Sequence, residues 1–329
     1  MLQRSLFQRR WIGRFGNRLH QYAYGASYAN LFNVKYQVIS AWEGDLLFEE
    51  KHHHVIEDDD LRESLCAIPN TSEADPARLS KISEYLSKRG ETIFNISPDR
   101  ATGTWHRPET HVSHDDLCAY HPTIFEGMSK EFLLTRLFRF QENVIRSDIY
   151  RRFEDQQGTY DIAHLRRDDI CRVNLKSSYP CVSKDSYELA FHQFGFNPTT
   201  MQWSTDDKLK KWGVGSPLDY SGKALGNVYP CGSIPDPEGN VFFGWFPDFL
   251  RLYFARTIFR ANSSFSFWAA FLSQQRETPA VVYSPRIERK VIYGDPKTPE
   301  QESHCKFEKG NHPHWVMAAK SKCPNILIH

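Results

Sequence analysis

The sequence predicts an α/β fold built in two domains. Short apolar segments typical of buried strands alternate along the chain with segments whose apolar residues recur every three or four positions, as on one face of a helix. With 329 residues the chain is also longer than one hydrophobic core usually serves. A polar stretch at residues 141–157 lacks a long apolar face. We therefore expect an N-terminal domain at residues 1–150 and a C-terminal domain at residues 151–329.

The composition argues against several classes of protein. The 41 basic and 40 acidic side chains nearly cancel, so no overall field attracts nucleic acid or an anionic membrane. The seven cysteines are scattered without a C-x-x-C pair, which argues against zinc and gives little support for a disulfide framework. Neither a signal peptide nor an apolar stretch long enough to span a membrane is visible. We expect a cytoplasmic protein with reduced cysteines, no metal, no nucleic-acid partner and no membrane span.

The N-terminal domain opens with a loop, a helix and a strand. Gly13 and Gly16 lie in a turn, apolar residues at helical spacing follow at 19–29, and residues 34–39 have the pattern of a strand. A helix that begins at such a turn offers free backbone N–H groups and the positive end of its dipole to a phosphate, and glycine lets a ligand approach closely. The turn alone does not distinguish this anion role from an ordinary connection.

A tryptophan and a glutamate follow this predicted strand, and two interpretations of them stay open. In the first, Trp42 stacks on a sugar face and Glu43 acts as a base. In the second, Trp42 covers the core and Glu43 is a surface charge. The three histidines at 52–54 do not predict a metal site, because adjacent side chains diverge on a strand or a helix. We expect a polar loop there.

In the C-terminal domain, charged residues follow a predicted strand at 160–165. A histidine, two arginines and two aspartates fall within residues 164–169, which is costly inside a core but natural where a strand ends. Ligands bind at the carboxyl edge of open α/β sheets, and a guanidinium fork matches the geometry of a phosphate. On this segment alone, an anion site and a surface ion-pair cluster explain the pattern equally well.

Two further strand ends carry polar residues. One predicted strand at 200–203 is followed by the polar residues 204–207, which include Asp206 and Asp207. Another at 257–261 is followed by Asn262 or Ser263 as the N-cap of a helix. Hydroxyl and basic groups at such an edge suit a diphosphate, whereas carboxylates accept hydrogen bonds from a guanine base or a ribose. No Walker A, G-x-G-x-x-G, His-Glu-x-x-His or G-x-S-x-G motif occurs. These features favour a nucleoside diphosphate ligand. The chain after Gly294 is expected to be polar and irregular.

Four segments resemble motifs of the α1,2-fucosyltransferase family (glycosyltransferase family 11), within the wider group of fucosyltransferases that share H-x-R-R-x-D. Residues 13–23 are similar to G-x-x-G-N-Q-x-x-Q-Y-A, and residues 164–169 match H-x-R-R-x-D. Residues 204–207 resemble the S/T-D-D turn, and residues 262–272 resemble N-S-[ST]-F-S-W-W-A-A-x-L. The sequence departs from the usual family pattern at Arg18, His20, Asp168 and Phe267.

The resemblance implies a GT-B-like fold of two facing Rossmann-like domains, with the donor bound mainly by the second domain and the acceptor by the first. It implies an inverting transferase that moves L-fucose from GDP-fucose to a hydroxyl of an oligosaccharide, with no metal and no cofactor beyond this nucleotide-sugar co-substrate. His164 and Arg166 would hold the leaving β-phosphate, and Glu43 is our candidate for the base. Trp42 and Glu43 are the acceptor-side candidates. The implied donor-binding residues are Gly16, Asn17, His164, Arg166, Asp169, Asp206, Asp207, Ser263, Ser264, Phe265 and Ser266.

Three alternatives stay open at this point. The same scaffold would also fit another donor, such as a different GDP-sugar or UDP-xylose. The acceptor is a second open point: it would be a glycan or a protein, because the Gly-Arg-Phe-Gly-Asn opening is also similar to that of protein O-fucosyltransferases. A non-catalytic protein that binds sugar nucleotides or glycans would keep the same binding residues.

Overall fold

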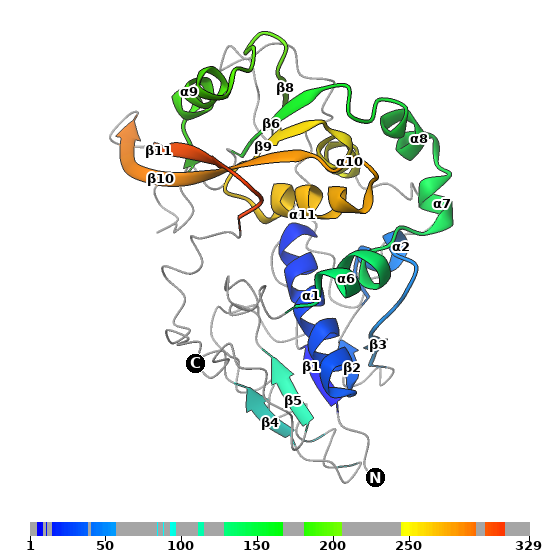
Figure 1. The fold of residues 1–329 in the computed structure, drawn as a ribbon. Coiled ribbons are helices and arrows are strands. Elements are labelled where there is room, and N and C mark those ends of the chain that lie inside the picture. Colours follow the sequence, from blue (N-terminus) through cyan, green and yellow to red (C-terminus); the bar gives the residue numbers. More distant parts are fainter. Residues whose placement is uncertain are drawn as a thin grey trace. The chain divides into compact units, whose positions relative to one another are not determined.

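The structure is a computed structural model that describes residues 5–8, 11, 15–38, 41–56, 84, 88, 93–96, 111–114, 128–166, 181–205, 245–293 and 300–312. The chain divides into two units, which adjoin in the sequence between Glu142 and Asn143. Each unit contains one sheet with helices beside it (Figure 1). The α/β fold class predicted from the sequence is confirmed.

A five-stranded parallel sheet forms the first unit, in the order β3-β2-β1-β5-β4. Strands β2 and β3 lie on one side of β1, and β5 and β4 lie on the other, so the strand order reverses beside β1. The described elements are β1 (Ser5–Gln8), α1 (Phe15–Phe32), β2 (Lys35–Val38), α2 (Gly44–Leu47), β3 (His54–Val55), β4 (Ile93–Ile96), β5 (His111–His114), α6 (Lys130–Phe132) and the π-helical turn η3 (Leu133–Leu137).

The first three elements of this unit form a β-α-β arrangement. Helix α1 and strand β2 confirm the helix and strand expected from the apolar spacing, whereas β1 is an addition, since its four residues carry too short a pattern to predict. Helix α1 packs closely on the sheet, because a Cβ atom at Gly25 would overlap the ring of Tyr36. Leu6 of β1 and Val38 of β2 are fully buried beneath it.

A six-stranded mixed sheet forms the second unit, in the order β7-β11-β10-β9-β6-β8. Strands β10 and β11 are antiparallel, and the other neighbouring pairs are parallel. The described elements are α7 (Glu142–Ile145), which begins at the end of the first unit, then α8 (Asp148–Glu154), β6 (Asp161–Leu165), β7 (Cys181–Val182), α9 (Lys184–Phe194), β8 (Gln202–Thr205), α10 (Phe246–Phe254), β9 (Thr257–Phe259), α11 (Ser264–Leu272), the 3₁₀ turn η5 (Ser273–Gln275), β10 (Val281–Tyr293) and β11 (Glu300–Lys309).

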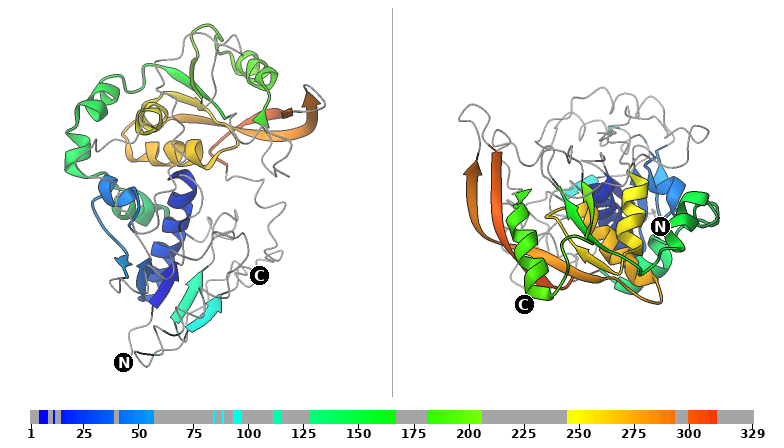
Figure 2. Two further views of the ribbon diagram at one scale, coloured as in Figure 1. Left: turned by 180° about the vertical axis from the view of Figure 1, so that it is seen from behind. Right: turned by 90° about the horizontal axis from the view of Figure 1, so that it is seen from above.

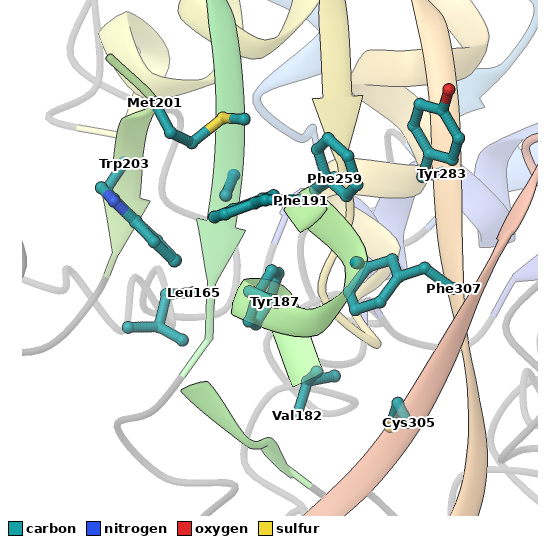
Figure 3. Packing of buried hydrophobic residues seen from close by; sticks show 12 residues of the cluster. Leu165, Val182, Tyr187, Phe191, Met201, Trp203, Phe259, Tyr283, Cys305 and Phe307 are labelled. Carbon is teal, nitrogen blue, oxygen red and sulfur yellow. The ribbon is translucent and has the colours of Figure 1, made fainter. Parts of the chain in front are cut away.

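Helices lie on both faces of the second sheet. Helix α9 lies on one face, and α10 and α11 lie together on the other (Figure 1). Beneath α9, Tyr187 and Phe191 pack on Trp203, Phe259 and other apolar side chains of β6, β8, β9, β10 and β11 (Figure 3). This arrangement leaves the carboxyl ends of the parallel strands between the two helical layers, where the connecting segments begin.

Strand β11 contradicts the expectation of an irregular tail after Gly294. It pairs with β10 over most of its length, and Figure 2 shows the two strands side by side as a long hairpin. Ser303, Cys305 and Phe307 are buried, whereas the residues between them are not, which is the period of a strand with one covered face. The sequence pattern was difficult to recognise because two of the three inward residues are small.

Cys181 is disulfide-bonded, which contradicts the expectation that all cysteines are reduced; Cys305, the other cysteine in the described ranges, is a free and buried thiol. None of the helices in the described part of the chain combines the length and the apolar composition that crossing a bilayer requires.

Candidate active site

The strand order of the second sheet reverses between β6 and β9. Strand β8 lies on one side of β6, and β9 and β10 lie on the other. All four strands are parallel, so their carboxyl ends share one edge. Ligands of open α/β sheets bind outside this edge at the reversal point. The predicted donor residues that the structure describes in this unit lie at the ends of β6 and β9.

His164 and Arg166 lie at the carboxyl end of β6. His164 is buried, and its ring centre lies 5.8 Å from the ring centre of Phe265 at the start of α11. The Tyr187 hydroxyl donates to the carbonyl oxygen of His164 at 2.6 Å, which fixes the backbone of this strand end from the α9 side. Arg166 follows the last residue of the strand and is partly exposed. The strand therefore presents an arginine to the edge while the histidine beside it is held by packing.

Helix α11 begins beyond the end of β9, and serines form its first turn. Ser263 is the N-cap, and its Oγ accepts a hydrogen bond from the backbone N–H of Phe265 at 3.3 Å. Ser264 and Phe265 are partly exposed. The first turn of a helix carries backbone N–H groups without intrahelical partners and the positive end of the dipole. The turn thus has the chemistry of an anion site beside the ends of β6 and β9.

Ser266 has a different position from the other serines of this turn. It is fully buried, and its Oγ donates to the carbonyl oxygens of Ala261 at 3.4 Å and Ser263 at 3.3 Å. Its side chain therefore fastens the start of α11 to the segment after β9. A direct contact between Ser266 and a ligand stays a prediction.

Several predicted donor residues fall outside the described ranges. These are Asp169 in the segment after β6, and Asp206 and Asp207 after β8. A carboxylate that was not singled out from the sequence lies close to the end of β8: Asp248 Oδ1 accepts from Ser204 Oγ and from Arg251 Nη1, both at 3.4 Å. The sequence feature that could have identified Asp248 is a Pro-Asp pair, which is typical of the first turn of a helix.

In the first unit, Gly16 and Asn17 lie in the first turn of α1. Both backbone carbonyl oxygens lie near side chains one turn later, with His20 Nδ1 3.1 Å from the Gly16 oxygen and Gln21 Nε2 donating to the Asn17 oxygen at 3.3 Å. Gly16 is buried and Asn17 is partly buried. The helix follows β1, where the strand order reverses, so this turn also lies at a position that suits a ligand.

Glu43 forms a buried ion pair with Arg18. Arg18 Nη1 lies 2.6 Å from Glu43 Oε1, and the two side chains are 6% and 2% exposed. The second oxygen, Oε2, is buried without a hydrogen-bond partner among the described atoms. Burial raises the pKa of Glu43, and Arg18 acts in the opposite direction. The structure therefore contradicts the interpretation of Glu43 as a surface charge and leaves a carboxylate oxygen available to a hydrogen-bond donor.

Trp42 is a core residue in this structure. It is 1% exposed, and its ring centre lies 5.0 Å from that of Trp11 and 4.8 Å from that of Tyr22. A ring that stacks on a sugar needs an open face, and neighbouring aromatic rings surround this one. The structure thus corrects the acceptor-side assignment of Trp42 in favour of the alternative in which it covers the core. The sequence did not predict the burial of Trp42, because it does not show that Trp11 and Tyr22 come together around the Trp42 ring.

The three histidines at 52–54 do not act together. His53 Nε2 lies 3.3 Å from Asp45 Oδ1 in a buried pair, whereas His52 Nε2 lies 3.0 Å from Glu50 Oε2. In the described ranges, no group of three histidine, cysteine or acidic side chains has the arrangement of a metal site. These residues instead fasten the segment that follows α2.

Comparisons with known proteins give the following results. No protein-family model matches the sequence, and no curated protein sequence matches it. Among solved structures, NodZ α-1,6-fucosyltransferase co-crystallised with GDP is 16% identical with a TM-score of 0.41, over 92% of this chain and 99% of that one. Fucosyltransferase NodZ from Bradyrhizobium is 14% identical with a TM-score of 0.39, over 86% and 96% of the two chains. A variant of Arabidopsis thaliana FUT1 in complex with GDP is 11% identical with a TM-score of 0.42, over 92% and 74%.

Proposed function

We propose that the chain is an inverting, metal-independent glycosyltransferase that transfers L-fucose from GDP-fucose to a hydroxyl group of a glycan. One observation carries the proposal. The segments that resemble the H-x-R-R-x-D and N-S-[ST]-F-S motifs come from distant parts of the sequence, yet His164 and Phe265 lie in contact at the reversal point of one sheet. A nucleotide site is expected at that point in an open α/β sheet. The resemblance supplies the donor, GDP-fucose, and the GT-B-like pairing of the two units.

The proposed reaction is a single displacement at the anomeric carbon of the sugar. The acceptor oxygen attacks from the side opposite the nucleotide, the bond from the anomeric carbon to the β-phosphate oxygen breaks, and its electron pair stays on GDP. Negative charge therefore grows on the phosphate as the bond breaks. Arg166 and the N–H groups at the start of α11 would stabilise that charge, because preorganised donors act where charge develops. This role is the one that a divalent ion fills in other transferases.

Glu43 is the proposed base in this scheme. The proton of the acceptor hydroxyl would pass to Oε2, the oxygen that Arg18 does not bind. Burial raises the pKa of Glu43 and Arg18 opposes that rise, and a raised pKa makes a carboxylate a stronger proton acceptor. Glu43→Gln should then lower the rate of transfer without lowering the affinity for GDP.

A binding and turnover experiment tests the proposal. Calorimetry should detect GDP and GDP-fucose but give weaker binding of UDP and UDP-xylose, and GDP release should depend on a glycan acceptor and persist in EDTA. Tighter binding of UDP-xylose would assign another donor. Turnover only with a protein acceptor would change the acceptor class, and binding without any turnover over a panel of glycans would favour a non-catalytic sugar-nucleotide-binding protein.

A further inference from the structure

Arg260 is a buried arginine just beyond the carboxyl end of β9. Its side chain is almost inaccessible, with the residue 1% exposed. Nη1 donates to Ser284 Oγ at 3.1 Å, to Asn311 Oδ1 at 2.6 Å and to the carbonyl oxygen of His312 at 2.7 Å. The guanidinium carbon lies 5.0 Å from the centre of the Phe267 ring. Within the described residues, no carboxylate pairs with Arg260 and its Nε has no hydrogen-bond partner.

The charge of Arg260 is therefore uncompensated in the described part of the chain. Burial lowers the pKa of its guanidinium to about 9, which still leaves the group protonated at neutral pH. A buried charge is strongly disfavoured unless it is paired, and buried arginines are normally paired with carboxylates. All three acceptors of Arg260 are neutral oxygens, which satisfy hydrogen bonds but do not cancel a charge.

The described groups next to Arg260 along β6 and α11 add positive rather than negative potential. Helix α11 begins four residues later and has the positive end of its dipole there. The register between β6 and β9 pairs Ala163 with Phe259, so the next pair along the strands is His164 and Arg260, at the usual strand spacing of about 4.8 Å. Arg166 follows two residues beyond His164. His164, Arg166 and Arg260 thus lie at the carboxyl ends of two adjacent strands, β6 and β9, at the strand-order reversal, and an anion bound at that edge would be attracted by each of them.

We propose that Arg260 is the buried counter-charge of an anionic ligand that binds at the carboxyl edge between β6 and β9. The identification of that anion as the diphosphate of a nucleotide sugar rests on the proposed function. Contact is not required, because a charge in a protein interior is screened much less than one at the surface. Two unit charges about 10 Å apart at an effective dielectric of about 20 change a dissociation constant roughly tenfold.

The most direct test places a negative charge beside Arg260 and keeps the arginine itself. Ser284→Asp would place a carboxylate beside Nη1, which already lies 3.1 Å from the Ser284 hydroxyl, and Ser284→Asn is a control of the same size without charge. Calorimetry on the full chain would measure binding of inorganic pyrophosphate and GDP. We expect Ser284→Asp to raise both dissociation constants about tenfold relative to Ser284→Asn, while its thermal stability equals or exceeds that of the control. Equal affinities in these two variants would overturn the inference.

A second pair of variants removes the charge. Arg260→Gln keeps amide donors for the neighbouring oxygens. Arg276→Gln is the matched control, since Arg276 is also buried in this unit but donates to backbone carbonyls at the end of α10. Arg260→Gln should weaken pyrophosphate and GDP about tenfold, and Arg276→Gln should not. If Arg260→Gln does not fold, the comparison of Ser284→Asp with Ser284→Asn decides whether Arg260 acts as the counter-charge.

The outcomes also separate this inference from the proposed function. Binding of pyrophosphate but not GDP would overturn the proposed donor, and the comparison of Ser284→Asp with Ser284→Asn using pyrophosphate would still decide the role of Arg260. A wild-type protein that binds neither probe would overturn the inference itself.

Discussion

Replacement of Arg18 by methionine should destabilise the first unit more than the loss of an ordinary surface contact. The Arg18–Glu43 pair is short and almost fully buried, and Glu43 has no second ion-pair partner among the described residues. Breaking a buried pair by removing one partner leaves an uncompensated charge and typically costs about 3–5 kcal/mol. Arg256→Met is a matched control. Arg256 is also 2.6 Å from a carboxylate, that of Asp161, but its side chain is 57% exposed, and such pairs contribute about 0–1 kcal/mol.

The cost of Arg18→Met should depend on pH in a defined direction. Burial raises the pKa of Glu43 and Arg18 opposes this, so the variant should have a still higher folded-state pKa. A carboxylate with a raised folded-state pKa favours folding below its unfolded pKa of about 4.3 and loses that contribution as the pH rises through the folded-state value. The destabilisation should therefore be smallest near pH ~4 and should grow toward pH ~7.

Urea unfolding followed by circular dichroism would measure this effect at several pH values. A double variant, Arg18→Met with Glu43→Leu, removes both charges and should recover most of the lost free energy of unfolding, since an apolar pair can replace a buried ion pair with little cost. The reasoning is refuted if Arg18→Met costs no more than Arg256→Met at pH 7, or if the double variant is no more stable than Arg18→Met.

Three further predictions concern transfer and packing. Arg166→Ala should lower the rate of fucose transfer about 10²–10³-fold with an unchanged melting temperature, and a rate above about a tenth of wild type would exclude its role. Ser263→Ala should lower the free energy of unfolding by about 1 kcal/mol in chemical denaturation, whereas Ser263→Asn should preserve the cap of α11; equal losses would argue against capping. Gly25→Ala should cost about 1–3 kcal/mol in the same assay, because the added methyl group overlaps the Tyr36 ring, and a neutral result would show that α1 can move away from β2.

The regular elements with strong local patterns were predictable from the sequence. Helix α9 begins after its expected cap Ser183, and α11 begins after Ser263, one of the two caps expected for it, because an N-cap is a local interaction that the sequence displays directly. Strands β1 and β11 were not predicted. The first is only four residues long, and the second buries Ser303 and Cys305 where an apolar pattern would normally be sought. Their pairing comes from partners distant in the sequence, which local periodicity does not contain.

The same distinction applies to the candidate site. The position of His164 and Arg166 at a strand end follows from a run of charged residues after an apolar segment, and the structure places them there. The pairing of Arg18 with Glu43 joins residues that are 25 positions apart, and so it depends on how α1 and the segment after β2 come together. The burial of Trp42 has the same origin. Sequence patterns identified which residue types gather at strand ends, whereas the structure identified their partners.

Three of the four buried arginines in the described ranges show how differently the fold accommodates the same charge. Arg18 is neutralised by a carboxylate. Arg276 donates to the carbonyl oxygens of Tyr253 and Ala255 at the negative end of the α10 dipole, and to that of Thr278, so a helix end substitutes for a counter-ion. Within the described ranges, the acceptors of Arg260 are neutral oxygens, and it lies near the positive end of α11. Arg260 therefore differs from the other two: among the described residues it has no compensating charge, and it lies at the strand-order reversal where we propose that an anion binds.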